Sequence, residues 1–167
     1  MSVDHHVYLI GMPGAGKSSV GRALADMLEL PFLDLDREIE RTAGCSVPEI
    51  FRHHGEERFR ELEADALASA AAGPPAVVSC GGGAPLRPGN QELMHGTGTV
   101  VWLNVPLSTL RRRLRDIIEK RPLVKDPLDL ERLYVQRDDT YRRVADRVVD
   151  ADGEPKAVAR AVLEVVR

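Results

Sequence analysis

Residues 11–18 read GMPGAGKS and place three glycines, one lysine and one serine in a single short stretch. The stretch fits the pattern G-x-x-x-x-G-K-[ST] without a gap, and it lies between an apolar run and a segment with helical spacing. Phosphate oxygens need several backbone amides that converge from one turn, and glycine lets the chain curl that closely. The following helix adds the positive end of its dipole. The stretch therefore predicts a nucleoside triphosphate site rather than an incidental glycine-rich turn.

Two side chains of this phosphate loop (residues 11–18) are suited to chemistry. We expect Lys17 to reach the β- and γ-phosphates and the hydroxyl of Ser18 to ligate Mg²⁺. The nucleotide is expected to be bound by six consecutive residues: Gly14, Ala15, Gly16, Lys17, Ser18 and Ser19. GTP switches, ATP-driven machines and small-molecule kinases share this loop, so it does not by itself identify the reaction.

The carboxylate that would complete a magnesium site is expected in FLDLD, residues 32–36. Motors and switches usually end a further strand in Asp, but the strand-like run 76–79 continues into Cys80 and three glycines without an acid. On an extended segment Asp34 and Asp36 point to the same side. One carboxylate can then orient magnesium-bound water while the other accepts the proton of an acceptor alcohol. The alternative is a solvated turn with Asp36 as a helix N-cap.

Gly81, Gly82 and Gly83 follow the third strand-like run and form a second stretch of bare backbone. Glycine costs roughly 1 kcal/mol in regular structure because it loses the most conformational freedom on folding. Three in a row are tolerable where a ligand must approach the main chain. A simple flexible turn is the alternative interpretation.

Two arginines are expected to hold an anion. Arg137 falls on the apolar stripe of its helix with Leu133 and Tyr141, and a guanidinium buried there needs an anionic partner. Arg60 begins another helix, with Glu63 one turn later to hold it in place. Two fixed guanidinium groups suit a substrate carboxylate. A structural salt bridge is the alternative for each arginine.

A dense basic region spans residues 111–125, where RRRLR is followed by KRPLVK. Arg121 and Pro122 should break the preceding helix into a loop. A basic loop opposite a triphosphate is typical of a closing lid that brings an arginine to the transferring phosphoryl group, and we single out Arg121 for that role. RNA binding is the rival interpretation, but the region lacks aromatic residues for base stacking and the chain has a net charge of −3.

The elements that must position these residues alternate between short apolar strands and amphipathic helices. Strands are predicted at 6–10, 31–35, 76–79, 99–105 and 147–149. Helical spacing continues through 20–28, 107–118 and 158–166. Ser46 and Glu49 predict a capping box that opens a short helix, and a longer helix from Phe59 should stop at Gly73. The alternation predicts a parallel sheet covered on both faces, with ligands at the carboxyl ends of its strands.

Size and composition narrow the class of protein. The 167 residues and near-neutral charge fit one domain without bias toward nucleic acid or a membrane surface. No apolar run is long enough to cross a bilayer, and the first residues do not match a signal peptide. Cys45 and Cys80 lack metal-ligand spacing, which favours a reducing cytoplasm. We expect a monomer, because no large apolar surface stripe requires self-association.

Taken together, these motifs resemble the shikimate kinases, and the resemblance covers residues 7–149. Six family motifs occur in the family's order: GMPGAGKS, FLDLD, FRELE, GGG, RPL and QRDDTYRRVA. The phosphate loop alone is common, whereas the ordered set is very specific. The resemblance implies an α/β, three-layer P-loop fold of the adenylate-kinase type, with a five-stranded parallel sheet in one domain over 1–167. It also implies a substrate-binding segment at about 34–62 and a mobile lid at about 115–127.

The activity that the resemblance implies is transfer of the γ-phosphoryl group of ATP to the 3-hydroxyl of shikimate, with Mg²⁺ as cofactor. Asp36 then binds the ring hydroxyls and assists proton removal, and Asp34 touches the magnesium shell. The other implied contacts are the carboxylate clamp Arg60 and Arg137, the glycines Gly81, Gly82 and Gly83 beneath the ring, the lid residue Arg121 and the adenine-stacking residue Arg113. The spacing to the lid is one residue longer than usual, so Arg115 is an alternative to Arg113.

Two rival functions stay open. A kinase of the same fold that acts on another polyol acid, such as gluconate, would share the phosphate loop but not need the paired arginines and the glycine triplet. A non-catalytic nucleotide-binding module would not need intact Lys17, Ser18, Asp34 and Asp36.

Overall fold

Strand β1 (His6–Ile10) lies at the centre of the sheet, and all five of its residues are buried. The computed structural model describes residues 3–113, 123 and 126–167. The strands β2 (Phe32–Asp34), β3 (Val77–Ser79), β4 (Gly98–Asn104) and β5 (Arg147–Asp150) complete a sheet of order β2-β3-β1-β4-β5. Every neighbouring pair is parallel. The predicted five-stranded parallel sheet is confirmed.

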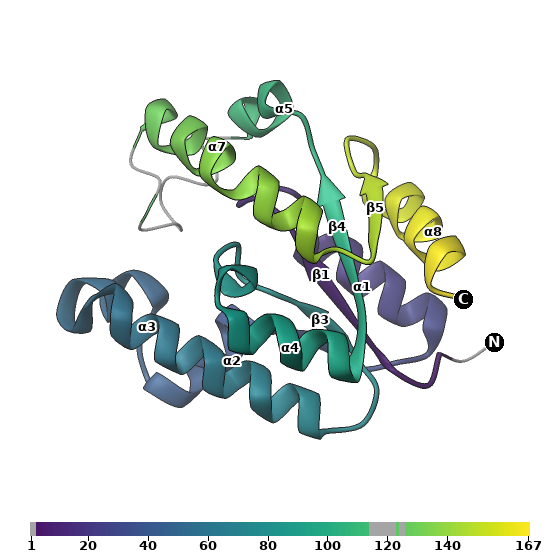
Figure 1. Cartoon of the computed structure of the whole chain (residues 1–167), viewed down its shortest axis with the longest axis horizontal. Coiled ribbons are helices and arrows are strands. Elements are labelled where there is room, and N and C mark those ends of the chain that lie inside the picture. Colours follow the sequence, from purple (N-terminus) through teal and green to yellow (C-terminus); the bar gives the residue numbers. More distant parts are fainter. Residues whose placement is uncertain (1–2, 114–122, 124–125) are drawn as a thin grey trace.

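Helices cover both faces of the sheet (Figure 1). They are α1 (Lys17–Leu28), α2 (Leu35–Ala43), α3 (Val47–Ala72), the 3₁₀ turn η1 (Ala84–Leu86), α4 (Pro88–Thr97), α5 (Leu107–Arg112), α7 (Pro127–Val144) and α8 (Pro155–Val166). The pair α1 and α8 pack together on one face, while α3, α4 and α7 lie on the other. This is the predicted three-layer arrangement, and it leaves the carboxyl ends of the strands free for a ligand.

The second strand is shorter than predicted. The pattern at 31–35 predicts a strand through Leu35, but β2 ends at Asp34 and α2 begins at Leu35. The reason is local: Oδ1 of Asp34 accepts a hydrogen bond of 3.1 Å from the backbone N–H of Asp36, so Asp34 is the N-cap of α2. Placing Asp36 on an extended segment is therefore wrong, and so is the alternative that makes Asp36 the cap. The ends of the other four strands lie within one residue of the predicted ones.

Helix α3 joins the two helices that the sequence predicts separately. Its N-cap is Ser46, whose hydroxyl accepts a hydrogen bond of 3.3 Å from the backbone N–H of Glu49. Gly55 interrupts the helical backbone with a φ of 80°, a value that favours glycine. The helix then continues to Ala72 and is capped by Gly73, as predicted.

A small separate hydrophobic cluster holds α2 against the first part of α3. It consists of Ile39, Val47, Ile50 and Phe59, and it is distinct from the main core that spans the sheet and its covering helices. The segment between β2 and the middle of α3 is thus built around its own apolar contacts.

The helix predicted at 107–118 is observed as α5, which runs from Leu107 to Arg112. The rest of that prediction, from residue 114 onward, lies outside the described residues. Across the described part of the chain, no helix combines the length and the apolar character that a membrane span requires.

Candidate functional site

The phosphate loop connects the end of β1 to the start of α1, as the sequence predicts. Gly16 is the N-cap of α1 with a φ of 89°, a left-handed conformation that glycine adopts without strain. The Nζ atom of Lys17 donates hydrogen bonds to the carbonyl oxygens of Gly11 at 2.6 Å and Met12 at 3.1 Å. The lysine is buried, so its charge lies against the loop where an anion would bind.

A cavity of about 170 Å³ lies along this loop. Its lining includes the six predicted nucleotide-binding residues together with Asp34, Asp36, Ser79, Cys80 and Gly81. The loop, the end of β2 and the end of β3 therefore meet at the carboxyl edge of the sheet. The two acids that the sequence pairs with the phosphate loop lie in the same cavity, although Asp36 reaches it from the first turn of α2.

Ser18 and Asp34 are direct neighbours. The hydroxyl of Ser18 donates a hydrogen bond of 2.9 Å to Oδ2 of Asp34. A hydroxyl and a carboxylate oxygen beside a phosphate cavity fit Mg²⁺, which is usually bound by one or two protein oxygens plus substrate phosphates and water. The described residues contain no group of three or more His, Cys, Asp or Glu that could hold a metal ion by themselves.

A second, smaller cavity of about 50 Å³ lies between α3, α7 and the glycine turn (Gly81, Gly82 and Gly83). The predicted substrate residues that line it are Asp36, Arg60, Gly81, Gly82, Gly83 and Arg137, and Glu63 joins them. Asp36 and Gly81 also line the phosphate cavity. The two cavities are therefore adjacent and share one carboxylate.

The glycine turn has a tighter packing role than the sequence suggests. A Cβ atom on Gly82 would lie 2.7 Å from Nη1 of Arg137, and one on Gly83 would overlap the guanidinium of Arg60. A Cβ on Gly81 would lie 2.6 Å from Oε2 of Glu63. The absent side chains leave room for the two arginines and the glutamate that face the cavity, so the turn is more than a flexible connection.

Arg60 is held by Glu63, as the sequence predicts. Nη1 of Arg60 donates a hydrogen bond of 2.8 Å to Oε1 of Glu63, whose side chain is only 1% exposed. Burial raises the pKa of Glu63 above its ordinary value, while the nearby charge and hydrogen bond of Arg60 oppose that rise. The ion pair orients the guanidinium, while burial disfavours the charged form of the glutamate.

Arg137 is buried on the inward face of α7, as the apolar stripe predicts. Tyr141 lies one helical turn later and is also buried. Tyr141 donates a hydrogen bond of 2.6 Å to the carbonyl oxygen of Gly82. The apolar stripe alone gives Tyr141 no functional role; its spacing of four from Arg137 is the signal that places the two side chains on one face of α7.

Arg113 lies beside the phosphate loop, where its Nη1 donates a hydrogen bond of 2.7 Å to the carbonyl oxygen of Gly14. The resemblance implies that this arginine contacts the adenine of the nucleotide. The alternative Arg115 and the lid residue Arg121 lie outside the described residues.

The thiol of Cys80 borders the phosphate cavity but is not suited to nucleophilic chemistry. Complete burial raises the pKa of the Cys80 thiol, and the negative charge of Glu63 adds to the rise. The thiolate, not the thiol, is the reactive form.

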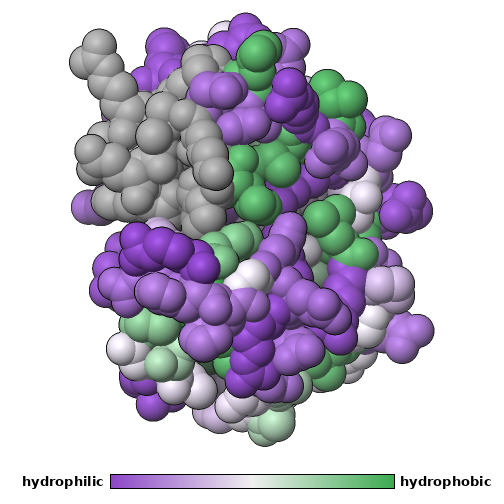
Figure 2. All heavy atoms as spheres, turned by 90° about the vertical axis from the view of Figure 1, so that its left-hand side faces the viewer, coloured by the Kyte–Doolittle hydropathy of each residue, from purple (hydrophilic) through white to green (hydrophobic). Residues whose placement is uncertain are grey.

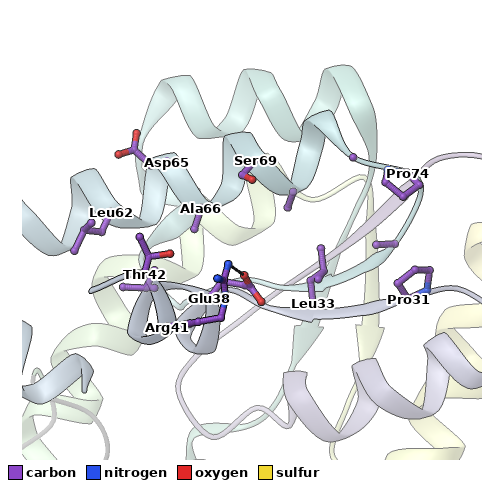
Figure 3. Close-up of a pocket in the computed structure, with 14 residues that line it drawn as sticks. Pro31, Leu33, Glu38, Arg41, Thr42, Leu62, Asp65, Ala66, Ser69 and Pro74 are labelled. Carbon is purple, nitrogen blue, oxygen red and sulfur yellow. Dashed lines mark hydrogen bonds and ion pairs between the residues drawn. The ribbon is translucent and has the colours of Figure 1, made fainter. Parts of the chain in front are cut away.

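The largest of the cavities described, about 460 Å³, lies away from these residues. Figure 3 shows it between α2 and α3 beside the edge strand β2, with an ion pair between Glu38 and Arg41 at its rim. It contains none of the predicted site residues. Volume alone therefore does not locate the functional site.

Comparisons with known proteins agree with this geometry. The family model described as shikimate kinase matches residues 13–167. A curated shikimate kinase of Dechloromonas aromatica is 45% identical over 154 residues, which cover 89% of this chain and 84% of the relative. A solved shikimate kinase of Acinetobacter baumannii, in complex with shikimate, superposes with a TM-score of 0.91 at 36% identity and covers 97% of this chain and 92% of that one.

A gluconokinase of Sinorhizobium meliloti has a TM-score of 0.61 at 20% identity, over 99% of this chain and 93% of that one. At that identity the likeness extends to the fold alone. The family match, the high identity over most of the chain and the arrangement of the two cavities lead to one conclusion: this chain belongs to the shikimate kinase family.

Proposed function

We propose that this chain transfers the γ-phosphoryl group of ATP to the 3-hydroxyl of shikimate, giving shikimate 3-phosphate and ADP. The observation that carries the proposal is the pair of adjacent cavities that share Asp36 and Gly81. One is lined by the phosphate loop and the other by two arginines. The solved relative from Acinetobacter baumannii contains shikimate, which supports the same substrate here.

On the nucleotide side, the amides of the phosphate loop and the buried charge of Lys17 bind the β- and γ-phosphates. Ser18 and Asp34 would hold Mg²⁺, because their oxygens lie 2.9 Å apart at the edge of the phosphate cavity. The bound ion would neutralise the charge that develops on the phosphate oxygens. Arg113 binds the adenine side of the nucleotide, supported by its contact with Gly14.

On the substrate side, Arg60 and Arg137 hold the shikimate carboxylate with their guanidinium groups. Asp36 lies in both cavities, so it can bind a ring hydroxyl and accept its proton as the oxygen attacks phosphorus. The glycine turn lies beneath the ring. Orientation of the two reactants is the main contribution expected of such a site.

The proposal extends to the organisation of the chain. The segment 34–62 acts as the substrate-binding segment, supported by the separate apolar cluster under α2 and α3. Residues 115–127 act as the lid and Arg121 as its catalytic arginine, a role that rests on the resemblance. The protein acts in the cytoplasm, consistent with its two free cysteines.

A monomer fits the surface of the described part of the chain. The large hydrophobic side chains exposed there are Leu86, Leu128, Val135 and Val148, and they belong to three different elements. On the face shown in Figure 2, hydrophilic residues surround separate groups of hydrophobic ones.

The decisive experiment measures ADP release by the purified protein with Mg²⁺-ATP and either shikimate or gluconate. We expect release that depends on shikimate and remains at the ATP-only background with gluconate. Turnover with gluconate at a comparable rate would contradict the proposal, because the paired arginines would then not select the acceptor. Binding of ATP without release of ADP in the presence of either acceptor would favour a non-catalytic module.

A further inference from the structure

The hydroxyl of Tyr141 lies where the phosphate loop meets the glycine turn. It donates a hydrogen bond of 2.6 Å to the carbonyl oxygen of Gly82, and the carbonyl oxygen of Gly11 lies 3.2 Å away. The residues are far apart in the sequence: Gly11 follows β1, Gly82 follows β3, and Tyr141 belongs to α7. One side-chain hydroxyl therefore contacts the backbone of both the phosphate loop and the glycine turn.

Each of these partners also contacts a charged group proposed to bind a ligand. The carbonyl oxygen of Gly11 accepts the hydrogen bond of 2.6 Å from Lys17, on the phosphate side. Gly82, on the carboxylate side, packs against Arg137, because a Cβ on Gly82 would lie 2.7 Å from Nη1 of that arginine. A path of contacts thus leads from Lys17 through the Gly11 carbonyl and Tyr141 to Gly82, against which Arg137 packs.

The packing around this path leaves little freedom. Tyr141 is 1% exposed, and its ring packs against Trp102. A Cβ on Gly82 would meet Nη1 of Arg137 at 2.7 Å, Cδ of Pro13 at 3.3 Å and the carbonyl oxygen of Gly11 at 3.4 Å. A displacement of the phosphate loop would therefore also displace the glycine turn.

The phenol stays a hydrogen-bond donor under working conditions. Burial raises the pKa of Tyr141 to about 12, although the positive charge of Arg137 opposes the rise. The hydroxyl has a single hydrogen, which the shorter contact directs mainly to Gly82. A shift of Gly11 toward or away from Tyr141 would change how this hydrogen is shared.

We propose that Tyr141 is a positioning residue that couples the nucleotide cavity to the carboxylate-binding cavity. When the phosphate loop is occupied, the Gly11 carbonyl is held in place, and the hydroxyl then fixes Gly82 and the guanidinium of Arg137. Arg137 is thereby oriented before the acceptor arrives. Because coupling between two sites is reciprocal, each ligand should tighten the binding of the other.

This inference rests on the proposed substrates. Isothermal titration calorimetry distinguishes a failure of the coupling from a failure of the proposed function. Shikimate is titrated into the protein with and without saturating Mg²⁺-ADP, and the ratio of the two dissociation constants is the coupling. For the wild type we expect shikimate to bind at least about fivefold more tightly with nucleotide, the lower end of typical coupling. In Tyr141→Phe, which retains the ring but lacks the hydroxyl, the ratio should fall below about twofold.

Tyr8→Phe is the matched control. Tyr8 is also buried, and its hydroxyl pairs with Thr97 at 2.6 Å, away from both cavities. The loss of a buried hydroxyl should lower the stability of both variants, but only Tyr141→Phe should lose the coupling. A merely structural role for Tyr141 predicts that both variants keep the wild-type ratio.

Gly82→Ala provides a second variant that perturbs the same junction without touching the tyrosine. Its new methyl should push on Arg137 and Pro13, so we expect it to lower the coupling as well. The inference is overturned if the folded wild type shows no coupling, or if folded Tyr141→Phe keeps the wild-type ratio. If Tyr141→Phe does not fold, a wild-type ratio in Gly82→Ala overturns it. If the wild type binds neither shikimate nor nucleotide, the proposed function itself is wrong.

Discussion

Asp34 uses both of its carboxylate oxygens for different purposes. Oδ2 accepts a hydrogen bond from Ser18 of the phosphate loop, and Oδ1 caps α2 through the backbone N–H of Asp36. The side chain proposed to hold Mg²⁺ therefore also determines where α2 begins, and with it the position of Asp36. At the scale of single residues, charged groups in this site are placed by contacts that serve folding and chemistry together.

The glycine turn gives a direct test at this scale. In Gly83→Ala the new methyl would overlap the guanidinium of Arg60, so we expect the arginine to be displaced. The KM for shikimate should rise about tenfold or more, as for the loss of one charged hydrogen bond of about 1.5–3 kcal/mol. Gly89→Ala is the control, because a Cβ there meets nothing within 4 Å. Steady-state kinetics with unchanged KM in Gly83→Ala would contradict this packing role.

Glu63 should make stability depend on pH in a defined direction. Burial raises its pKa in the folded state above the ordinary value of 4.5, so the folded protein holds this proton more tightly than the unfolded chain does. The free energy of unfolding should therefore fall as pH rises from about 4.5 through the folded-state pKa. Glu63→Gln removes this contribution, so the stability of the wild type relative to the variant should decline over that interval. Urea unfolding at several pH values measures it, and a relative stability that rises with pH would contradict the assignment.

At the scale of elements, α7 is the helix that links the two ligand-binding regions. It begins with a capping box in which Asp126 accepts hydrogen bonds from the backbone N–H groups of Leu128 at 2.8 Å and Asp129 at 3.1 Å. The same helix carries Arg137 and Tyr141 on its buried face. A cap that stabilises the start of α7 therefore also supports the residues that face the site.

Removal of this cap should destabilise the protein measurably. We expect Asp126→Ala to lower the free energy of unfolding by about 1 kcal/mol, because two backbone N–H groups lose their acceptor. Asp126→Ser retains a capping oxygen and should stay near the wild type. Chemical denaturation compares the three proteins, and equal loss in both variants would mean that the cap is not the source of the stability.

At the scale of the whole molecule, the parallel sheet brings distant segments of the chain together. The phosphate loop follows β1, Asp34 is the last residue of β2, and the glycine turn follows β3. These strands are neighbours in the order β2-β3-β1. The position of the site therefore depends on the packing of the central strand. Leu9 of β1 is completely buried.

Leu9→Ala should accordingly lower the free energy of unfolding by about 2–5 kcal/mol, the range found for buried leucine in well-packed cores. Val135→Ala is the control, because Val135 is 71% exposed and should change stability by no more than about 0.5 kcal/mol. Thermal or urea unfolding distinguishes the two. A small effect of Leu9→Ala would mean that the sheet relaxes around the lost side chain.

Several features of the site could be predicted because their signals are local. The phosphate loop is a contiguous pattern, and the ion pair of Arg60 with Glu63 follows from a spacing of three on one helix. The burial of Arg137 follows from the apolar stripe around it. The end of the second strand is predicted wrongly, because one hydrogen bond from the backbone N–H of Asp36 to Asp34 competes with a strand pattern of only a few residues.

Local patterns along the chain were enough to predict the alternation of strands and helices, the family and the set of residues available for chemistry. These features could be predicted because residues close together in the sequence carry both signals: the periodicity of apolar side chains and the glycines that let the backbone surround a phosphate. The three-dimensional packing was needed to show that Arg60 and Arg137 lie against the glycine turn, and that Tyr141 contacts both Gly11 and Gly82. These contacts join segments separated by many residues, and their distances depend on how the helices pack on the sheet, which no local pattern specifies.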